Sequence, residues 1–238
     1  MVICAKIKMK KHWIKNIIRI PPNDIDRSKF LRLDKNERVI NFEKKFLSYI
    51  KKSIKTYEIA AYPDINKIYK ILSKELKIPK NMICLTAGSD IALKMCFEYF
   101  TGIGDKIITL EPTFGMVDVY AKIYNLKNIK IHYDKNLNLK LNEFLSKIKK
   151  DISLIIIANP NSPTGTIIKH EDLKKIIVKS HYYKIPIVID EAYFGFYNFS
   201  YIKFIKKYKN VIITRTFSKA FGLAGLRVGF LVSDPLIS

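Results

Sequence analysis

The chain has 238 residues, 48% of them hydrophobic, so it is long enough to bury the core of one large domain. It carries 43 basic and 21 acidic residues, for a formal net charge of +22 at pH 7. Only six of the basic residues are Arg, and the Lys are spread along the whole chain. No RNP, helix-turn-helix or zinc-finger spacing is present, so we do not expect nucleic-acid binding as the primary role.

The sequence shows no signal for a membrane or for an oxidising compartment. No apolar run reaches the ~20 residues of a membrane span, and residues 1–11 lack the apolar stretch of a secretion signal. Cys4, Cys84 and Cys96 are an odd number of cysteines without CxxC or metal-type spacing. We therefore expect a cytoplasmic protein with reduced thiols, no metal site and no membrane partner.

Strands and helices are expected to alternate after a basic N-terminal stretch. Residues 1–40 are weakly periodic, and we expect an arm or part of a smaller domain there, with one large domain over residues 41–238. Apolar spacing predicts helices over residues 65–76, 91–100, 114–124, 141–148 and 172–182. Apolar runs predict strands over residues 82–85, 106–110, 129–133, 154–158, 187–189, 211–214 and 228–232. This alternation indicates an α/β fold with a mostly parallel sheet.

Polar or Gly/Pro-containing segments follow several of the predicted strands directly. In α/β folds, ligands bind outside the carboxyl ends of the strands. The segments at that edge are residues 88–89, 112–114, 159–165, 190–193 and 216–219. We therefore expect one ligand site built from these five segments.

The segment around Lys219 indicates which ligand that is. Thr216 and Ser218 precede this lysine, and Arg227 follows eight residues later. An amine forms an imine with the aldehyde of pyridoxal phosphate (PLP), while hydroxyls and a guanidinium hold its phosphate dianion. Once a substrate amine displaces it, the same lysine can move the substrate's α-proton. Lys219 is therefore the expected attachment point of PLP.

Asp190 and Tyr193 follow a buried strand and suit the ring of the same cofactor. A carboxylate at Asp190 can pair with the pyridine nitrogen and keep it protonated. Tyr193, three residues on, can hydrogen-bond the phenolic oxygen of the cofactor. A helix cap or a turn at the strand end is the other interpretation of Asp190, but the combination with Tyr193 favours a functional role.

The phosphate is expected at the start of the helix that follows residue 87. Gly88 permits close approach, and Ser89 and Asp90 open the helix, whose free N–H groups attract an anion. N-capping by Ser89 or Asp90 is the alternative, and both roles can hold at once. Arg227 adds a fork of donors for the phosphate. Phe114 can stack on the pyridine ring or serve as a core aromatic, and the sequence leaves both open.

Together these segments resemble the PLP-dependent class I and II aminotransferases, and most closely their histidinol-phosphate aminotransferase branch. The matching segments occur in the family's order and extend over roughly residues 30–232. They are Leu33-Asp34-Lys35-Asn36-Glu37, Ala61-Tyr62-Pro63-Asp64, Ala87-Gly88-Ser89-Asp90, Pro112-Thr113-Phe114-Gly115-Met116, Asn159-Pro160-Asn161-Ser162-Pro163-Thr164-Gly165, Asp190-Glu191-Ala192-Tyr193 and the run from Thr216 to Gly229.

The resemblance implies a three-layer PLP-transferase large domain and a role for each matching residue. Lys219 is then the lysine that binds PLP, Asp190 the partner of the ring nitrogen, and Tyr193 the ligand of the phenolic oxygen. The phosphate cup would be Gly88, Ser89, Asp90, Thr216, Ser218 and Arg227. Tyr62 would reach across the interface of a homodimer to the neighbouring subunit's phosphate, and Phe114 would stack on the ring.

The reaction implied is amino transfer between an amine or amino acid and a 2-oxo acid, with histidinol phosphate and 2-oxoglutarate as the favoured pair. Two alternatives stay open, a PLP-dependent decarboxylase of a phosphorylated amino acid such as threonine phosphate and a truncated, non-catalytic remnant. The family commonly has Asn directly before Pro-Thr-Gly, where this chain has Ser162; Ser162 can still donate, or Asn161 can rotate in. Family members also continue past the position of Ser238 into a small domain with a carboxylate-binding arginine. We therefore expect little activity from residues 1–238 alone.

Overall fold

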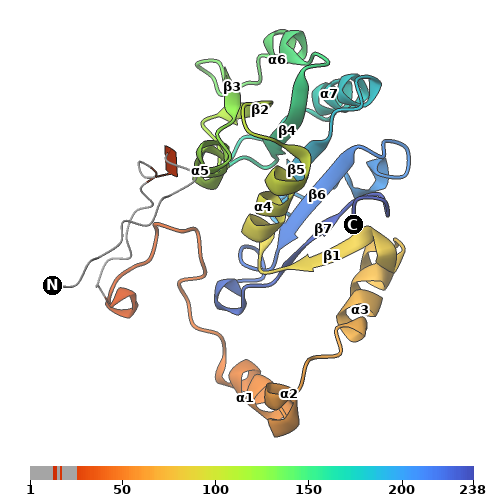
Figure 1. Cartoon of the computed structure of the whole chain (residues 1–238). Coiled ribbons are helices and arrows are strands. Elements are labelled where there is room, and N and C mark those ends of the chain that lie inside the picture. The colour runs from red at the N-terminus through yellow and green to blue at the C-terminus, as the bar shows by residue number, and fades with distance from the viewer. Residues whose placement is uncertain (1–12, 15–16, 18–25) are drawn as a thin grey trace, which may run out of the picture. The chain divides into compact units, whose positions relative to one another are not determined.

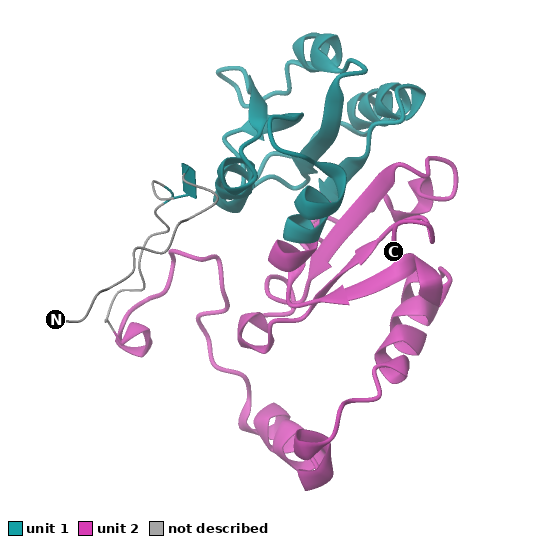
Figure 2. Ribbon diagram, in the orientation of Figure 1, with its two compact units in different colours: residues 1–25, 93–189 teal, residues 26–92, 190–238 magenta. Residues whose placement is uncertain are grey.

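The computed structural model describes residues 13–14, 17 and 26–238, so most of the predicted arm over residues 1–40 lies outside the described residues. The chain divides into two compact units (Figure 2). Unit 1 consists of residues 93–189 with the described residues before 26, and unit 2 of residues 26–92 and 190–238.

Of the described residues, unit 1 contains the parallel strands and three complete helices, and it shares a fourth helix (Ser89–Phe100) with unit 2. Its strands follow the order β5–β4–β2–β3, and β2 pairs in parallel with both β3 and β4. The interior of β4 is the continuous apolar run 154–157, fully buried as is typical of a parallel strand covered on both faces. The elements are β2 (Lys106–Glu111), α5 (Gly115–Ile123), β3 (Lys127–His132), α6 (Leu141–Lys147), β4 (Ile152–Ala158), α7 (His170–Tyr182) and β5 (Ile187–Asp190), whose last residue belongs to unit 2.

Unit 2 contains the antiparallel strands in the order β1–β7–β6 (Figure 1). Its elements are α1 (Lys44–Ser53), α2 (Thr56–Ala60), α3 (Asn66–Leu76), β1 (Ile83–Thr86), the start of α4 (Ser89–Phe100), β6 (Val211–Thr216) and β7 (Gly229–Val232). Short 3-10 turns lie at Arg27–Lys29, Lys80–Met82, Ile202–Phe204 and Ala224–Leu226.

A glycine lets three segments of unit 2 meet. A Cβ added to Gly229 would lie 2.6 Å from the carbonyl carbon of Gly88 and 2.7 Å from the carbonyl oxygen of Arg215. Real Cβ atoms do not approach backbone that closely, so only glycine fits at the start of β7. The loop at Gly88 and the end of β6 thereby come into contact at one edge of the unit.

The α/β fold predicted from the sequence is confirmed, and each predicted helix and strand is present with ends shifted by at most a few residues. The helices α1 and α2 were not predicted, and neither buries any residue. The apolar residues Phe46, Leu47 and Ile50 of α1 do have helical spacing, so this pattern was overlooked, whereas α2 has only five residues. Among the described helices, none is long and apolar enough to cross a membrane.

Candidate cofactor site

Asp190 is the last residue of β5, and its side chain is buried. Among the described residues, only one of its two carboxylate oxygens accepts hydrogen bonds. Its Oδ1 accepts hydrogen bonds from Thr214 Oγ1 at 2.8 Å and from the Ala192 N–H at 3.1 Å. Because both donors go to Oδ1, Oδ2 is left to accept a hydrogen bond from a ligand. Burial, together with the nearby carboxylates of Glu191 and Asp90, raises the pKa of Asp190 to about 6 against the lowering effect of these two hydrogen bonds.

The raised pKa of Asp190 predicts a pH-dependent stability of the ligand-free protein. The folded state holds the proton more tightly than the unfolded chain, whose Asp pKa is 3.8. The stabilising contribution is therefore full below pH 3.8 and is lost as the pH rises through about 6, at most roughly 3 kcal/mol in size. Denaturant unfolding between about pH 4 and about pH 8 should show the wild type losing stability relative to Asp190→Asn, which cannot titrate. A constant difference between the two proteins would contradict this.

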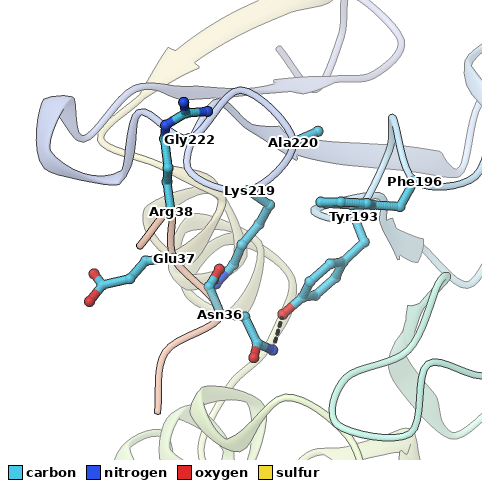
Figure 3. A pocket seen from close by; sticks show the side chains of 8 residues that line it. All are labelled: Asn36, Glu37, Arg38, Tyr193, Phe196, Lys219, Ala220 and Gly222. Atoms are coloured by element: carbon cyan, nitrogen blue, oxygen red, sulfur yellow. Dashed lines mark hydrogen bonds between the residues drawn. The ribbon is translucent and has the colours of Figure 1, made fainter. Parts of the chain in front are cut away.

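Lys219 and Tyr193 both contact one segment of the N-terminal region (Figure 3). The Nζ of Lys219 donates to the carbonyl oxygens of Lys35 at 2.7 Å and Asn36 at 3.3 Å. The Nδ2 of Asn36 donates to the hydroxyl of Tyr193 at 2.8 Å, and Lys219 Nζ lies 5.5 Å from the centre of the Tyr193 ring. The lysine and the tyrosine expected to touch the cofactor are therefore neighbours.

A pocket of about 480 Å³ opens beside these two residues. Its lining comes from the N-terminal region, from the turn after β5 and from the segment after β6, all within unit 2. The lining residues are Asn36, Glu37, Arg38, Tyr193, Phe196, Lys219, Ala220 and Gly222. The sequence analysis gave Asn36 no role. The only signal for it was its place in the segment 33–37 that resembles the family.

Arg227 occupies the predicted phosphate cup without a carboxylate partner. Its guanidinium donates only to neutral oxygens, those of Ser218 Oγ, Ala224 O and Ala87 O, each at 3.3 Å. No salt bridge to Arg227 occurs within the part of the chain that the structure describes. A cation held only by three long hydrogen bonds suits an anionic ligand.

The other cup residues lie around this guanidinium. Gly88 has φ +87°, and a Cβ there would lie 2.7 Å from Arg227 Nη2, so glycine is required. Ser89 is buried as the first residue of α4 and Asp90 is the second, which places the free N–H groups of that helix beside Gly88. Thr216 Oγ1 donates to Ser218 Oγ at 2.9 Å. This arrangement of donors fits a phosphate.

The three predicted site residues of unit 1 lie in or next to loops after strands. Phe114 is half-buried directly before α5. Asn161 is buried, accepts from Thr113 Oγ1 at 3.0 Å and donates to Pro112 O at 2.9 Å and Thr164 Oγ1 at 2.8 Å. Ser162 beside it is half-buried. The amide of Asn161 thus joins its own loop to the loop after β2. The roles of all three residues toward a cofactor stay predictions.

Tyr62 lies in the segment between α2 and α3 with its side chain fully exposed, at 102% of the reference area. Several large apolar side chains of α1, α2 and their flanks are also exposed, namely Leu47, Tyr49, Ile54, Tyr57 and Ile59. An apolar surface of this kind on a folded protein is typical of an interaction site.

Known proteins resemble this chain in sequence and in fold. The sequence profile of class I and II aminotransferases matches residues 50–237. A histidinol-phosphate aminotransferase of Clostridium novyi is 35% identical over 94% of this chain, and one of Thermoanaerobacter pseudethanolicus is 34% identical over 87%. The chain spans 63% and 59% of the length of these two relatives. The crystal structure of the histidinol-phosphate aminotransferase from Clostridium acetobutylicum superposes with a TM-score of 0.74 at 27% identity, over 85% of this chain and 60% of that one. The chain belongs to the class I and II aminotransferase family.

Proposed function

We propose that this chain is the cofactor-binding part of a PLP-dependent aminotransferase, which exchanges an amino group between an amino compound and a 2-oxo acid. The observation that carries the proposal is the placement of Lys219 next to Tyr193, in the same unit as the buried Asp190 and the cup around Arg227. Residues 41–238 would form the large domain, and residues 1–40 an arm or part of a smaller one.

The residues present fit PLP. The phosphate would be held by Arg227, Ser218, the hydroxyl of Thr216 and the groups at the start of α4, namely Gly88, Ser89 and Asp90. Asp190 would accept a hydrogen bond from the ring nitrogen through Oδ2, and Tyr193 would donate its hydroxyl proton to the phenolic oxygen. Phe114 would stack on the ring, with Asn161 or Ser162 near its oxygen. Bound PLP supplies an aldehyde that condenses with amines and a ring that withdraws electrons from the amine's carbon.

The protein's own part of the chemistry falls mainly to two side chains. Lys219 would carry the cofactor and then, once free, move the proton of the substrate's α-carbon. Asp190 would keep the proton on the ring nitrogen throughout. Because the Nζ of Lys219 donates to the carbonyls of Lys35 and Asn36 in the ligand-free protein, these contacts must be released before the amine can react.

Histidinol phosphate with 2-oxoglutarate is the substrate pair we propose. The histidinol phosphate is supported by the two relatives that are named histidinol-phosphate aminotransferases. The net charge of +22 also favours anionic substrates. The test is to extend the chain with the C-terminal domain of a related aminotransferase and to load it with PLP. Histidinol phosphate is then added, and a single turnover is followed by the loss of the visible band and the appearance of the oxo product. Release of carbon dioxide from threonine phosphate, with no amino transfer, would favour the decarboxylase alternative.

We further propose a cytoplasmic homodimer in which Tyr62 contacts the partner's phosphate site. The exposed apolar side chains around Tyr62 support this, because a partner surface would cover them. Sedimentation of the wild type tests the dimer, and PLP titration of Tyr62→Phe tests the contact with the phosphate. The phenylalanine preserves the apolar surface and removes only the hydroxyl that would reach the phosphate.

Arg227→Gln is expected to weaken PLP binding by about tenfold to a hundredfold, because a charged hydrogen bond contributes about 1.5–3 kcal/mol. Equilibrium dialysis or fluorescence titration measures the affinity. Pyridoxal, which lacks the phosphate, is the matched control ligand, and its affinity should stay unchanged. If both ligands lost affinity equally, Arg227 would not be the phosphate contact.

A further inference from the structure

A buried ion pair lies beside Asp190 and has no part in the site described so far. Glu191 and Arg215 are 1% and 7% exposed. The Oε2 of Glu191 accepts from Arg215 Nε at 3.0 Å and Nη2 at 2.8 Å, and from Ser200 Oγ at 2.9 Å. Its Oε1 accepts from the Tyr201 N–H at 2.6 Å. One carboxylate thus ties the two ends of the loop 191–201 to β6.

The same loop is fixed at two further points. The guanidinium carbon of Arg215 lies 3.5 Å from the centre of the Phe194 ring, and the Phe194 N–H donates to the carbonyl of Glu191 at 2.9 Å. Gly195 has φ +102°, and a Cβ there would lie 2.7 Å from the Cβ of Ala220, the residue after Lys219. The turn that carries Tyr193 therefore packs directly against the segment that carries Lys219.

The register of β6 puts the ion pair behind the site. Neighbouring residues of a strand point to opposite faces, so Arg215 faces away from Thr214 and Thr216. Thr214 bonds Asp190, and Thr216 bonds Ser218 of the cup. Along the other segment, Glu191 directly follows Asp190 and lies two residues before Tyr193. Each member of the ion pair is thus adjacent in sequence to residues that would contact the cofactor or its phosphate.

We propose that Glu191 and Arg215 are positioning residues, whose ion pair holds the turn after β5 on β6 so that Asp190 and Tyr193 reach the cofactor together. The effect on the cofactor rests on the proposed function, whereas the effect on the turn can be measured in the ligand-free chain. Stability alone is a poor explanation of the pair. Removing two charges from water costs so much free energy that an uncharged pair of similar volume often stabilises the fold equally well. The forked contact of the guanidinium with the carboxylate, in contrast, specifies one geometry.

The test is the double variant Glu191→Gln/Arg215→Met of the 238-residue chain, which leaves no unpaired buried charge and retains an acceptor for the Tyr201 N–H. We expect nearly unchanged global unfolding but about tenfold faster amide hydrogen exchange in peptides covering residues 190–201. The matched control is Lys106→Met/Asp151→Asn, which removes an exposed ion pair of 2.5 Å in unit 1 and should leave that exchange rate unchanged. Unchanged exchange in the double variant would overturn the positioning role, whether or not the chain binds PLP.

A second measurement separates positioning from a structural role. In the double variant loaded with PLP, we expect a shifted visible spectrum at fixed pH and about tenfold weaker PLP binding. Arg215→Lys, which keeps the charge but loses the fork, should lie between wild type and the double variant. A wild-type spectrum and affinity in a folded double variant would refute the inference. Absence of PLP binding by the wild type would instead refute the proposed function, and the exchange measurement would then decide the inference alone.

Discussion

Lys219→Ala is expected to abolish borohydride-stable attachment of PLP and to slow amino transfer by more than about a thousandfold. No other described lysine combines a neighbouring tyrosine ring, a pocket of about 480 Å³ and the phosphate cup in the same unit. The variant should fold as the wild type does, because Lys219 bonds only to two carbonyl oxygens of the segment 35–36 and those can bind water instead.

A peptide map after borohydride reduction measures the outcome. The wild type should carry the reduced pyridoxyl group on Lys219 alone, and Lys219→Ala should carry none. Lys203→Ala is the matched control, because that lysine is exposed in the 3-10 turn after the loop 191–201. A label on a different lysine of the wild-type protein would overturn the assignment of the site.

Local pattern was enough to predict the sheet and its helices. Buried strands such as β4 are continuous apolar runs, and α3 shows the three-and-four spacing of a helix packed on one side. The helix α1 was missed although Phe46, Leu47 and Ile50 give it an apolar stripe at helical spacing. The helix α2 has only five residues, too few for a helical period to be recognised. Predicted elements were therefore most reliable where a longer segment packs on the core.

The residues of the candidate site that lie at the ends of strands were predicted from the sequence. Contacts between segments that are distant in the sequence were not. Asp190 is the last residue of β5 and Lys219 lies three residues after the end of β6, so the topology alone brings them to one edge. The contact of Asn36 with Tyr193 joins residues 157 positions apart, and that of Glu191 with Arg215 joins residues 24 apart. Contacts between residues this far apart in the sequence leave no local pattern, so they become visible only in the folded chain.

In a version of the chain extended by the C-terminal domain of a related aminotransferase, Asp190→Ala is expected to slow amino transfer by about a hundredfold to a thousandfold, while leaving the fold intact. The carboxylate is the group that would hold a proton on the ring nitrogen, and without it the cofactor cannot withdraw electrons effectively from the substrate. The ligand-free fold should lose little, because burial already raises the pKa of Asp190 to about 6 and an ionised carboxylate is costly there at neutral pH.

Thermal unfolding, PLP titration and kcat separate these effects in the same protein. Thr214→Val is the matched control, since it removes one hydrogen bond to Oδ1 and leaves Oδ2 free to bind the ring. It should lower kcat less than Asp190→Ala does, because the charge remains. A rate near that of the wild type in Asp190→Ala with PLP bound would show that another group protonates the ring. The same kcat loss in both variants would show that the orientation of the carboxylate, rather than its charge, limits the reaction.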